Sequence, residues 1–310
     1  MLVAILLVAL GTIIAVAVAY ESAMSARRGT ATFSFDEALL VGQGAEALAA
    51  YGLRAVQQQN PSGDIYPAQP WAQPVGPLEV VPGVTLEASL EDLQGRFNLN
   101  WLVVSSGPDA GKPDPIEVAA FNHLLELVQI EPKWADLLVD WISSNPVAQP
   151  DGAKDSTYLG QNPPYLTANE YITSASELLA LPGFGHDRYE RLAPFVTALP
   201  PASMLNICSA PGEVLDAFIP GRREWSSDDA GLAKNRAGAP GCFPTVQGYQ
   251  ATFDSKDYAL ASSRFATKSS FFRLASLITI GTSEFNLYSL LYMDQNGPFI
   301  HPIQRTFSAD

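Results

Sequence analysis

The chain opens with a long apolar stretch, LVAILLVALGTIIAVAVA at residues 2–19, in which Thr12 is the only polar side chain. At about 1.5 Å per residue, a helix of this length spans about 27 Å, close to the thickness of a bilayer core. A cleavable signal peptide usually has a basic start and a shorter apolar region of roughly 7–15 residues. The stretch follows no basic residue, so the pattern predicts a retained membrane helix rather than a cleaved signal.

Residues 36–57 carry small or apolar side chains at the three-to-four spacing of one helix face. The stripe consists of Leu40, Gly44, Ala47, Leu48, Tyr51 and Ala55. Gly42 and Gly44 weaken the helical tendency, yet the periodicity predicts that the membrane helix continues into water as one rod. We expect the stripe to contact either a sheet or sister helices.

Short β-type runs flank the middle of the chain. A connection rich in proline and glycine at 60–77 leads to runs at 78–90 and 95–104, which we expect to pair with each other. Three further runs lie near the C-terminus, at 269–281, 284–293 and 299–307.

The region between these runs has helical periodicity. Segments expected to be helical are 116–130, 132–142, 174–181, 187–197 and 212–218. Strands, then helices, then strands indicate an α+β protein, in which an all-helical domain is inserted into a sheet domain that the C-terminus completes. The expected divisions are a transmembrane helix at 1–20, its amphipathic continuation at 21–57, the first part of the β domain at 58–110, the helical insert at 111–265 and the closing strands at 266–310.

The composition narrows the possible partners. The chain has 310 residues, of which 47% are hydrophobic, and a formal net charge of −14. An acidic surface repels phosphate backbones, because proteins bind nucleic acid largely through cations that displace counterions. It also gains nothing from anionic lipid, so membrane attachment should be hydrophobic. We therefore expect no nucleic-acid partner.

The sequence contains no recognisable catalytic motif. His123, His186 and His301 are scattered, and neither H-E-x-x-H nor G-x-S-x-G occurs. His186 and Asp187 are adjacent, but sequence neighbours seldom orient each other as a catalytic pair must. We therefore expect no enzyme activity.

The segment LPGFG at 181–185, followed by the predicted helix at 187–197, is similar to a helix-hairpin-helix turn, whose backbone N–H groups can contact phosphates. The nearby cations Arg188 and Arg191 stand among acidic residues, and the net charge favours a purely architectural hairpin. The alternative function is a membrane-tethered periplasmic binding protein, a receptor for a substrate or for DNA that uses the helical insert.

Cys208 and Cys242 are too few for a disulfide framework and wrongly spaced for a four-ligand zinc site. They allow one bridge, which would close a polar, glycine-rich loop in an oxidising compartment. By the loop-entropy estimate such a bridge is worth roughly 3–4 kcal/mol. We predict a Cys208–Cys242 disulfide, and the alternative is two free buried thiols.

An acidic cluster lies between the predicted helices. Its members are Asp136, Asp140, Asp151, Asp155, Ser156 and Glu170. Hard oxygen ligands on irregular loops suit Ca²⁺, which takes roughly six to eight of them. The sequence has no EF-hand spacing, and acidic loops in an acidic protein are usually just solvated. The residues alone leave both interpretations open.

Several segments, in this order along the chain, resemble one known family. They are the N-terminal apolar helix, LEDLQGRFNLNWL (90–102), DSTYLGQNPPYLTANE (155–170), SELLALPGF (176–184), RLAPFVTALP (191–200), LNICSAP (205–211), FRLASLITIG (272–281) and SLLYMDQNGPF (289–299). By this ordered set the chain resembles the minor pseudopilins of type II secretion, the general secretion pathway protein K family.

The resemblance implies a pilin-like fold, with a long N-terminal helix packed on an antiparallel sheet and a large inserted all-helical domain of the SAM-like or helical-hairpin kind. It implies a structural tip subunit that caps the type II secretion pseudopilus and helps drive folded periplasmic proteins across the outer membrane. Expected partners are minor pseudopilins of the I and J classes, other pseudopilins, inner-membrane assembly proteins, secreted substrates, the outer-membrane secretin, and membrane lipid before assembly.

The resemblance also implies processing and a location. Family members carry a short basic leader, which a prepilin peptidase cuts after a glycine before methylating the new N-terminus, so we expect this chain to be a processed or trimmed form. Most pilins have a glutamate near the position of Ile5, and this class typically lacks it. Arg27 and Arg28 alone would favour a cytoplasmic C-terminus, but a basic leader would outweigh them. The expected location is the inner membrane, crossed once, with most of the chain in the periplasm and, after assembly, at the pseudopilus tip.

The resemblance finally implies a structural Ca²⁺, because the insert of this family holds calcium. One departure is that Ser143, Ser144 and Asn145 follow Trp141, where family members often have further acids. The expected ligands are Asp151, Asp155 and Glu170, with Asp140 as a fourth.

Overall fold

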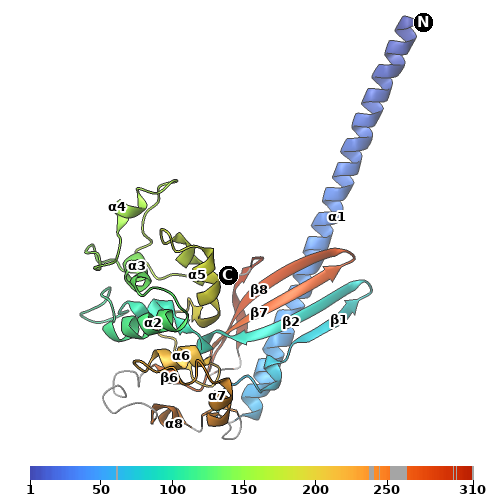
Figure 1. Cartoon of the computed structure of the whole chain (residues 1–310). Coiled ribbons are helices and arrows are strands. Elements are labelled where there is room, and N and C mark those ends of the chain that lie inside the picture. The colour runs from blue at the N-terminus through green and yellow to red at the C-terminus, as the bar shows by residue number, and fades with distance from the viewer. Residues whose placement is uncertain are drawn as a thin grey trace.

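The computed structural model describes residues 1–60, 62–236, 241–243, 245–251, 264–295, 297 and 299–308. Its first element is a single helix, α1 (Leu2–Gln59), whose N-terminal part projects far beyond the rest of the molecule (Figure 1). The first buried residue of α1 is Ala38. The predicted continuous rod, apolar at its start and packed on a domain only later, is therefore confirmed.

The face of α1 that packs on the domain is not the predicted stripe. The buried residues of α1 are Ala38, Gly42, Ala45, Glu46, Leu53 and Val56. Leu40, Leu48 and Tyr51, which belong to the predicted stripe, are 68%, 47% and 71% exposed. The sequence predicts that this stripe contacts either a sheet or sister helices. The prediction of a contact with the sheet is wrong. The helix has two apolar faces, and the one with the smaller side chains packs against the sheet.

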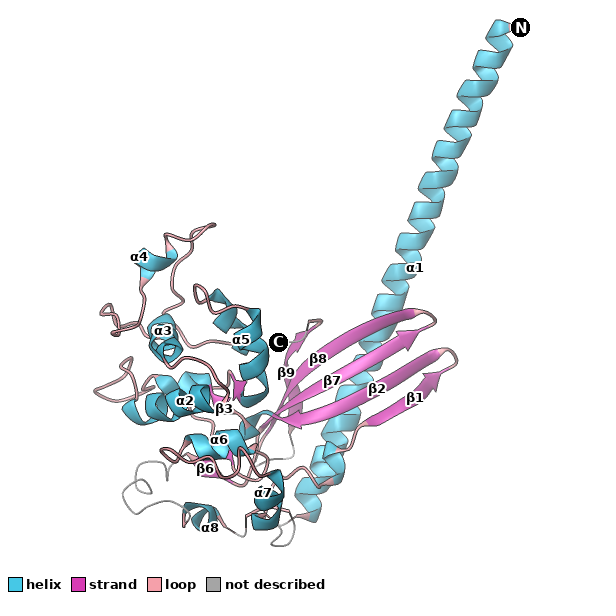
Figure 2. Cartoon of the chain, viewed as in Figure 1, coloured by secondary structure: helices cyan, strands magenta, loops and turns pink. Residues whose placement is uncertain are grey.

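The main sheet has the strand order β1-β2-β7-β8-β9, and all neighbours are antiparallel (Figure 2). The strands are β1 (Val75–Val81), β2 (Val84–Asp92), β7 (Phe271–Ile280), β8 (Ser283–Met293) and β9 (Ile300–Thr306). Alternate residues of β2, β7 and β8, among them Leu86, Ile278 and Leu287, form one core with the buried face of α1. A short 3-10 helix, η1 (Pro70–Ala72), adds Trp71 to this core.

The three C-terminal strands are confirmed, but the first two predicted β runs differ from the structure. Residues 78–90 include a tight turn at Gly83, which has φ +82°, and this turn joins β1 and β2 into a hairpin that covers most of that range. Residues 95–104 do not pair with it. They contribute the two-residue strand β3 (Phe97–Asn98), which pairs in parallel with β4 (Val196–Thr197). The prediction that 78–90 and 95–104 pair is therefore wrong, since a proline-glycine turn supplies the first strand with its own partner.

The inserted unit is mostly helical. It contains α2 (Pro115–Leu127), α3 (Lys133–Ile142), α4 (Asp155–Tyr158), α5 (His186–Leu192), α6 (Gly212–Ala217), α7 (Asp229–Asn235) and α8 (Val246–Gln250). Its 3-10 helices are η2 (Leu93–Gly95), η3 (Leu99–Leu102), η4 (Ala175–Ala180) and η5 (Ala193–Phe195). Besides β3 and β4 it includes one more parallel pair, β5 (Leu205–Asn206) with β6 (Phe265–Ala266). The insert is therefore mostly helical, and the prediction that it is all-helical is wrong.

A separate core holds the insert together, and it begins earlier in the chain than residue 111. Phe97, Leu99, Trp101 and Val103 belong to this core together with the helices, whereas we assigned 58–110 to the β domain. Asn98 both shapes this segment and ties it to the rest of the insert: its side chain accepts a hydrogen bond from Asn100 N at 3.1 Å and from Leu199 N at 3.0 Å. By packing, the insert starts close to the end of β2.

The two cores meet at a buried polar junction. Asp92, at the end of β2, is 5% exposed, and its carboxylate accepts hydrogen bonds from Gln94 N (2.9 Å), Asn206 Nδ2 (2.8 Å) and Ser269 Oγ (2.6 Å). Asn206 Nδ2 also donates to Ile65 O at 2.8 Å. The insert is thereby tied to the sheet through hydrogen bonds that a buried carboxylate requires.

Candidate functional site

The first candidate surface is the projecting part of α1. Large apolar side chains cover it, among them Leu2, Ile5, Leu6, Ile13, Val16 and Phe33, each at least 62% exposed. Within the described residues, α1 is the helix that is long and apolar enough to cross a membrane. An uncovered apolar helix of this length suits a lipid bilayer or a bundle of similar helices.

An ion pair between the buried Glu46 and the partly exposed Arg305 holds α1 against the sheet. Glu46 is 5% exposed; its Oε1 accepts from Arg305 Nε at 2.7 Å and from Ser289 Oγ at 2.6 Å, and its Oε2 accepts from Arg305 Nη2 at 2.8 Å. Burial disfavours the charged carboxylate, but the hydrogen bonds from Arg305 and Ser289 outweigh it, so the pKa of Glu46 is lowered. This pairing fixes both the rotation and the height of α1 relative to β8 and β9.

The second candidate surface is an apolar groove beside α1. It lies between the helix and the β1–β2 hairpin, and its lining includes Leu48, Tyr51, Ala55, Trp71, Val75 and Leu90. Three of these residues, Leu48, Tyr51 and Ala55, belong to the predicted stripe. The stripe therefore continues into the groove, where α1 meets the β1–β2 hairpin at the edge of the sheet.

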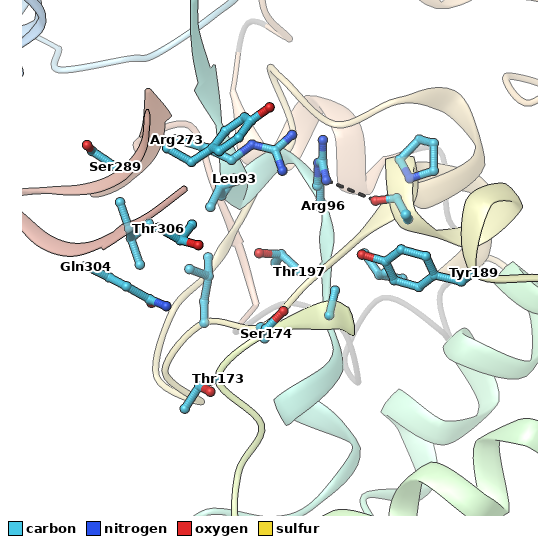
Figure 3. A pocket seen from close by; sticks show the side chains of 18 of the residues that line it. Leu93, Arg96, Thr173, Ser174, Tyr189, Thr197, Arg273, Ser289, Gln304 and Thr306 are labelled. Atoms are coloured by element: carbon cyan, nitrogen blue, oxygen red, sulfur yellow. Dashed lines mark hydrogen bonds between the residues drawn. The ribbon is translucent and has the colours of Figure 1, made fainter. Parts of the chain in front are cut away.

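A third hollow lies between the insert and the sheet (Figure 3). Two arginines line it, and both are engaged: Arg96 Nη1 donates to Ala193 O at 2.9 Å, and Arg273 Nη2 pairs with Glu91 Oε2 at 2.8 Å. Arg96 pairs with Glu91 as well. His186, at the rim, contacts Glu190 at 3.1 Å with both side chains largely exposed. A histidine–glutamate pair exposed to this extent lacks the buried, hydrogen-bonded orientation of the imidazole in a catalytic triad.

The predicted calcium ligands do not gather into one site. No group of three His, Cys, Asp or Glu side chains suited to a metal occurs among the described residues. Asp155 Oδ1 accepts a hydrogen bond from Thr167 N at 3.1 Å. The backbone N–H of Asp151 donates to Asp136 Oδ2 at 3.1 Å. Glu170 is exposed and lines a separate hollow. Asp140 is buried beside Lys154. The arrangement does not fit the predicted ligand set, and calcium stays a prediction that rests on the resemblance.

The predicted disulfide is present: Cys208 and Cys242 are bridged, with their Cα atoms 4.6 Å apart. The sulfur atoms lie in the core of the insert, since both residues are at most 3% exposed. The bridge follows β5 and lies beside Phe243, which belongs to the same core, so it acts as a covalent part of the insert's packing.

The glycine turn before α5 has the geometry of a hairpin, with φ +82° at Gly183 and +78° at Gly185. Its cations are engaged by groups of the protein itself. Arg188 pairs with Glu131 at 2.9 Å, and Arg191 Nη1 donates to Gln129 O at 2.8 Å. Side chains engaged in this way support the architectural interpretation of the hairpin.

Sequence reasoning missed the residues that position α1. Glu46 is an isolated charge on a helix face of small apolar residues, and that mismatch was the available signal. Its partner Arg305 lies 259 residues away in the sequence, which no local pattern reveals. Lys154, which contacts Asp140, was likewise missed, because a lysine among acids reads as a solvated surface.

The long helix on an antiparallel sheet, with a large unit inserted between two of its strands, defines a pilin-like subunit with an enlarged globular head. The family described as "Type II secretion system (T2SS), protein K" matches residues 95–201. Type II secretion system protein K of Pseudomonas aeruginosa is 30% identical over 94% of this chain and 87% of its own length, and that of Pectobacterium carotovorum is 27% identical over 100% and 95%. The chain belongs to the type II secretion system protein K family.

The fold agrees with a solved structure. A chain of the GspK-GspI-GspJ complex from the enterotoxigenic Escherichia coli type 2 secretion system is similar with a TM-score of 0.78 and 22% identity, over 91% of this chain and 100% of that one. The predicted α+β pilin-like architecture with a large insert is thereby confirmed.

Proposed function

We propose that this chain is the tip subunit of a type II secretion pseudopilus. It caps the filament in a complex with minor pseudopilins of the I and J classes, and it helps to drive folded periplasmic proteins across the outer membrane. The similar chain of the GspK-GspI-GspJ complex supports the choice of partners.

The observation that carries the proposal is the placement of the insert. The projecting half of α1 leaves the molecule at one end, and the helical unit lies beyond the opposite end of the sheet (Figure 1). Subunits that assemble through parallel stems leave that opposite end facing the next position along the filament. A head as large as this insert fills the position, so growth above it is blocked and the subunit ends the filament.

The stripe and groove beside α1 supply the contact with neighbouring stems. Leu40, Leu48 and Tyr51 are exposed on the side of α1 away from the sheet, and Gly44 and Gly52 have no atom near a hypothetical Cβ. Small residues beside exposed apolar ones permit close helix–helix approach. Before assembly, the apolar segment 2–19 anchors the chain in the inner membrane, with the head in the periplasm.

The test is co-isolation of the full chain with its partners. The I- and J-class subunits of the same host are co-expressed with it, the membranes are dissolved in detergent, and the tagged I-class subunit is captured. The double variant Leu48→Asp/Tyr51→Asp should lose co-isolation and secretion in a strain lacking its own K-family subunit. Gln43→Asp, an exposed residue of the same helix, is the matched control and should retain both. Full co-isolation of the double variant, or secretion without the K-family subunit, would contradict the proposal.

A further inference from the structure

An ammonium group lies where three oxygen atoms converge at the end of α3. Lys154 Nζ donates to Asp140 O and to Ser143 O, each at 2.7 Å, and lies 3.9 Å from Asp140 Oδ1. The lysine side chain is only 15% exposed. Ser143 is the C-cap of α3, so its carbonyl belongs to the negative end of the helix, where a cation is favoured.

The carboxylate at this point is enclosed by the following loop. Asp140 is 1% exposed, and its Oδ2 accepts from Gln149 N at 3.0 Å. Gly152 closes over it so tightly that a Cβ at that position would meet Asp140 Oδ2 at 1.9 Å. Asp140 Oδ1 has no hydrogen-bond partner within the described parts of the chain. A buried carboxylate with an unused oxygen requires a cation nearby, because burying an unpaired charge is costly.

These features describe a cation site in which the chain supplies its own cation. The convergent oxygens are of the kind that Ca²⁺ binds, two carbonyls and a carboxylate, but Ca²⁺ needs roughly six to eight oxygens. The further acids expected to provide them, Asp151, Asp155 and Glu170, are exposed and do not converge with these oxygens. An ammonium group needs only the three acceptors that are present.

We propose that Lys154 takes the place of a metal ion at a site formed by Asp140 and the carbonyl oxygens of Asp140 and Ser143, and that the site accepts Ca²⁺ only when the ammonium group is removed. The wild-type chain thus orders the loop between α3 and α4 without metal. Removing the lysine opens space for an ion, with water completing its coordination shell.

The test uses the full chain in detergent, first stripped with a chelator and then supplied with millimolar CaCl₂. The melting temperature of the wild type should be the same in both conditions. Lys154→Ala should melt lower than wild type by about 4 °C or more in chelator, and CaCl₂ should restore at least half of that loss, with calorimetry detecting bound Ca²⁺. Adding Asp140→Asn to this variant should abolish the restoration. Lys112→Ala, which removes a lysine that is 60% exposed in a surface pair, is the control and should behave as wild type.

Three results would overturn the proposal. They are a Ca²⁺-dependent rise in the melting temperature of the wild type that Asp140→Asn removes, an unchanged melting temperature of Lys154→Ala in chelator, and a folded Lys154→Ala that takes up no Ca²⁺. Should Lys154→Ala not fold, Lys154→Met keeps the apolar stem of the side chain and is judged by the same criteria.

Discussion

Gly42 of α1 lies directly against Leu287 of β8: a Cβ at Gly42 would be 2.5 Å from Leu287 Cδ2. Leu287 is itself 2% exposed, so it has little room to move. The absence of a side chain at Gly42 therefore sets how closely the helix approaches the sheet, and the loss of helix propensity at this position is offset by the packing that it permits.

We predict that Gly42→Leu lowers the free energy of unfolding by roughly 1–3 kcal/mol, because the added side chain overpacks the helix–sheet contact. Gly44→Leu is the matched control, since nothing lies within 4 Å of its Cβ position. It should instead gain up to about 1 kcal/mol from helix propensity. Denaturant unfolding of the full chain in detergent measures both, and equal effects of the two substitutions would contradict the packing argument.

The second prediction concerns the pair formed by Glu46 and Arg305. Glu46→Gln should lower the free energy of unfolding by roughly 1–2 kcal/mol near neutral pH, because it weakens the charge-assisted hydrogen bonds from Arg305. The effect stays this small because Arg305 is 42% exposed and solvent partly screens its charge. The pKa of Glu46 is lowered from 4.5 in the folded state. Its stabilisation is therefore present above about pH 4.5 and is lost as the pH falls through the folded pKa. The difference in the free energy of unfolding between wild type and Glu46→Gln should become smaller in acid. Glu37→Gln, at an exposed position of the same helix, is the control and should not differ from wild type.

The third prediction runs in the opposite direction with pH. Glu117 of α2 is 3% exposed; burial raises its pKa to about 7, although Arg264 Nε lies 3.0 Å away and favours the charged form. A raised folded pKa means that the stabilisation is complete below the unfolded value of 4.5 and is lost as the pH rises through about 7. Between pH 5 and pH 8 the wild type should lose stability relative to Glu117→Gln. Tryptophan fluorescence in urea at several pH values measures this, with exposed Glu126→Gln expected to follow the wild type.

The fourth prediction tests the junction between the two cores. Asn206→Ala removes a donor to the Asp92 carboxylate, to Ser269 Oγ and to Ile65 O. Because a buried carboxylate loses a hydrogen bond, the substitution should lower the free energy of unfolding by roughly 1.5–3 kcal/mol. Asn235→Ala, whose amide donates to Gly231 O at an exposed position, should change stability by less than about 0.5 kcal/mol. If both substitutions had the same small effect, the junction would not hold the units together.

The fifth prediction concerns the disulfide. Reduction should destabilise the insert by roughly 3–4 kcal/mol, on the loop-entropy estimate for a sequence separation of 34 residues. Cys208→Ala/Cys242→Ala should show the same loss without reductant and no further response to it. A wild-type melting curve unaffected by reductant would contradict this role.

Local patterns predicted the elements whose signals are strong and continuous. The rod 2–57, the strands at 269–307 and the helices around Phe121 and Trp141 follow from periodicity alone, because burial of one face dictates which positions are apolar. The disulfide followed from there being only two cysteines. In each case the information lies within one element or in the residue count.

The errors come from contacts that the sequence does not display. The predicted stripe has the larger side chains. The sheet instead packs against the face of α1 with small residues, Gly42, Ala45 and Ala49, because these allow the helix to approach closely. Leu48 and Tyr51 on the other face stay exposed. The run 95–104 alternates apolar and polar residues like a strand, but Asn98 and Asn100 are buried with their apolar neighbours and bond to Leu199 and Ile172. The position of Lys154 beside the buried Asp140 was also missed, because a single lysine forms no motif; calcium at the acidic cluster stays a prediction.

The insert leaves the sheet after Asp92 and returns before Phe271, and Asp92 pairs directly with Phe272. Two adjacent strands thus carry the whole insert on one side, while the ladder between them remains unbroken. The contacts that Gly42 and Glu46 make with β8 and β9 lie outside the insert. A larger or smaller insert would therefore leave both the β2–β7 ladder and these contacts of α1 in place.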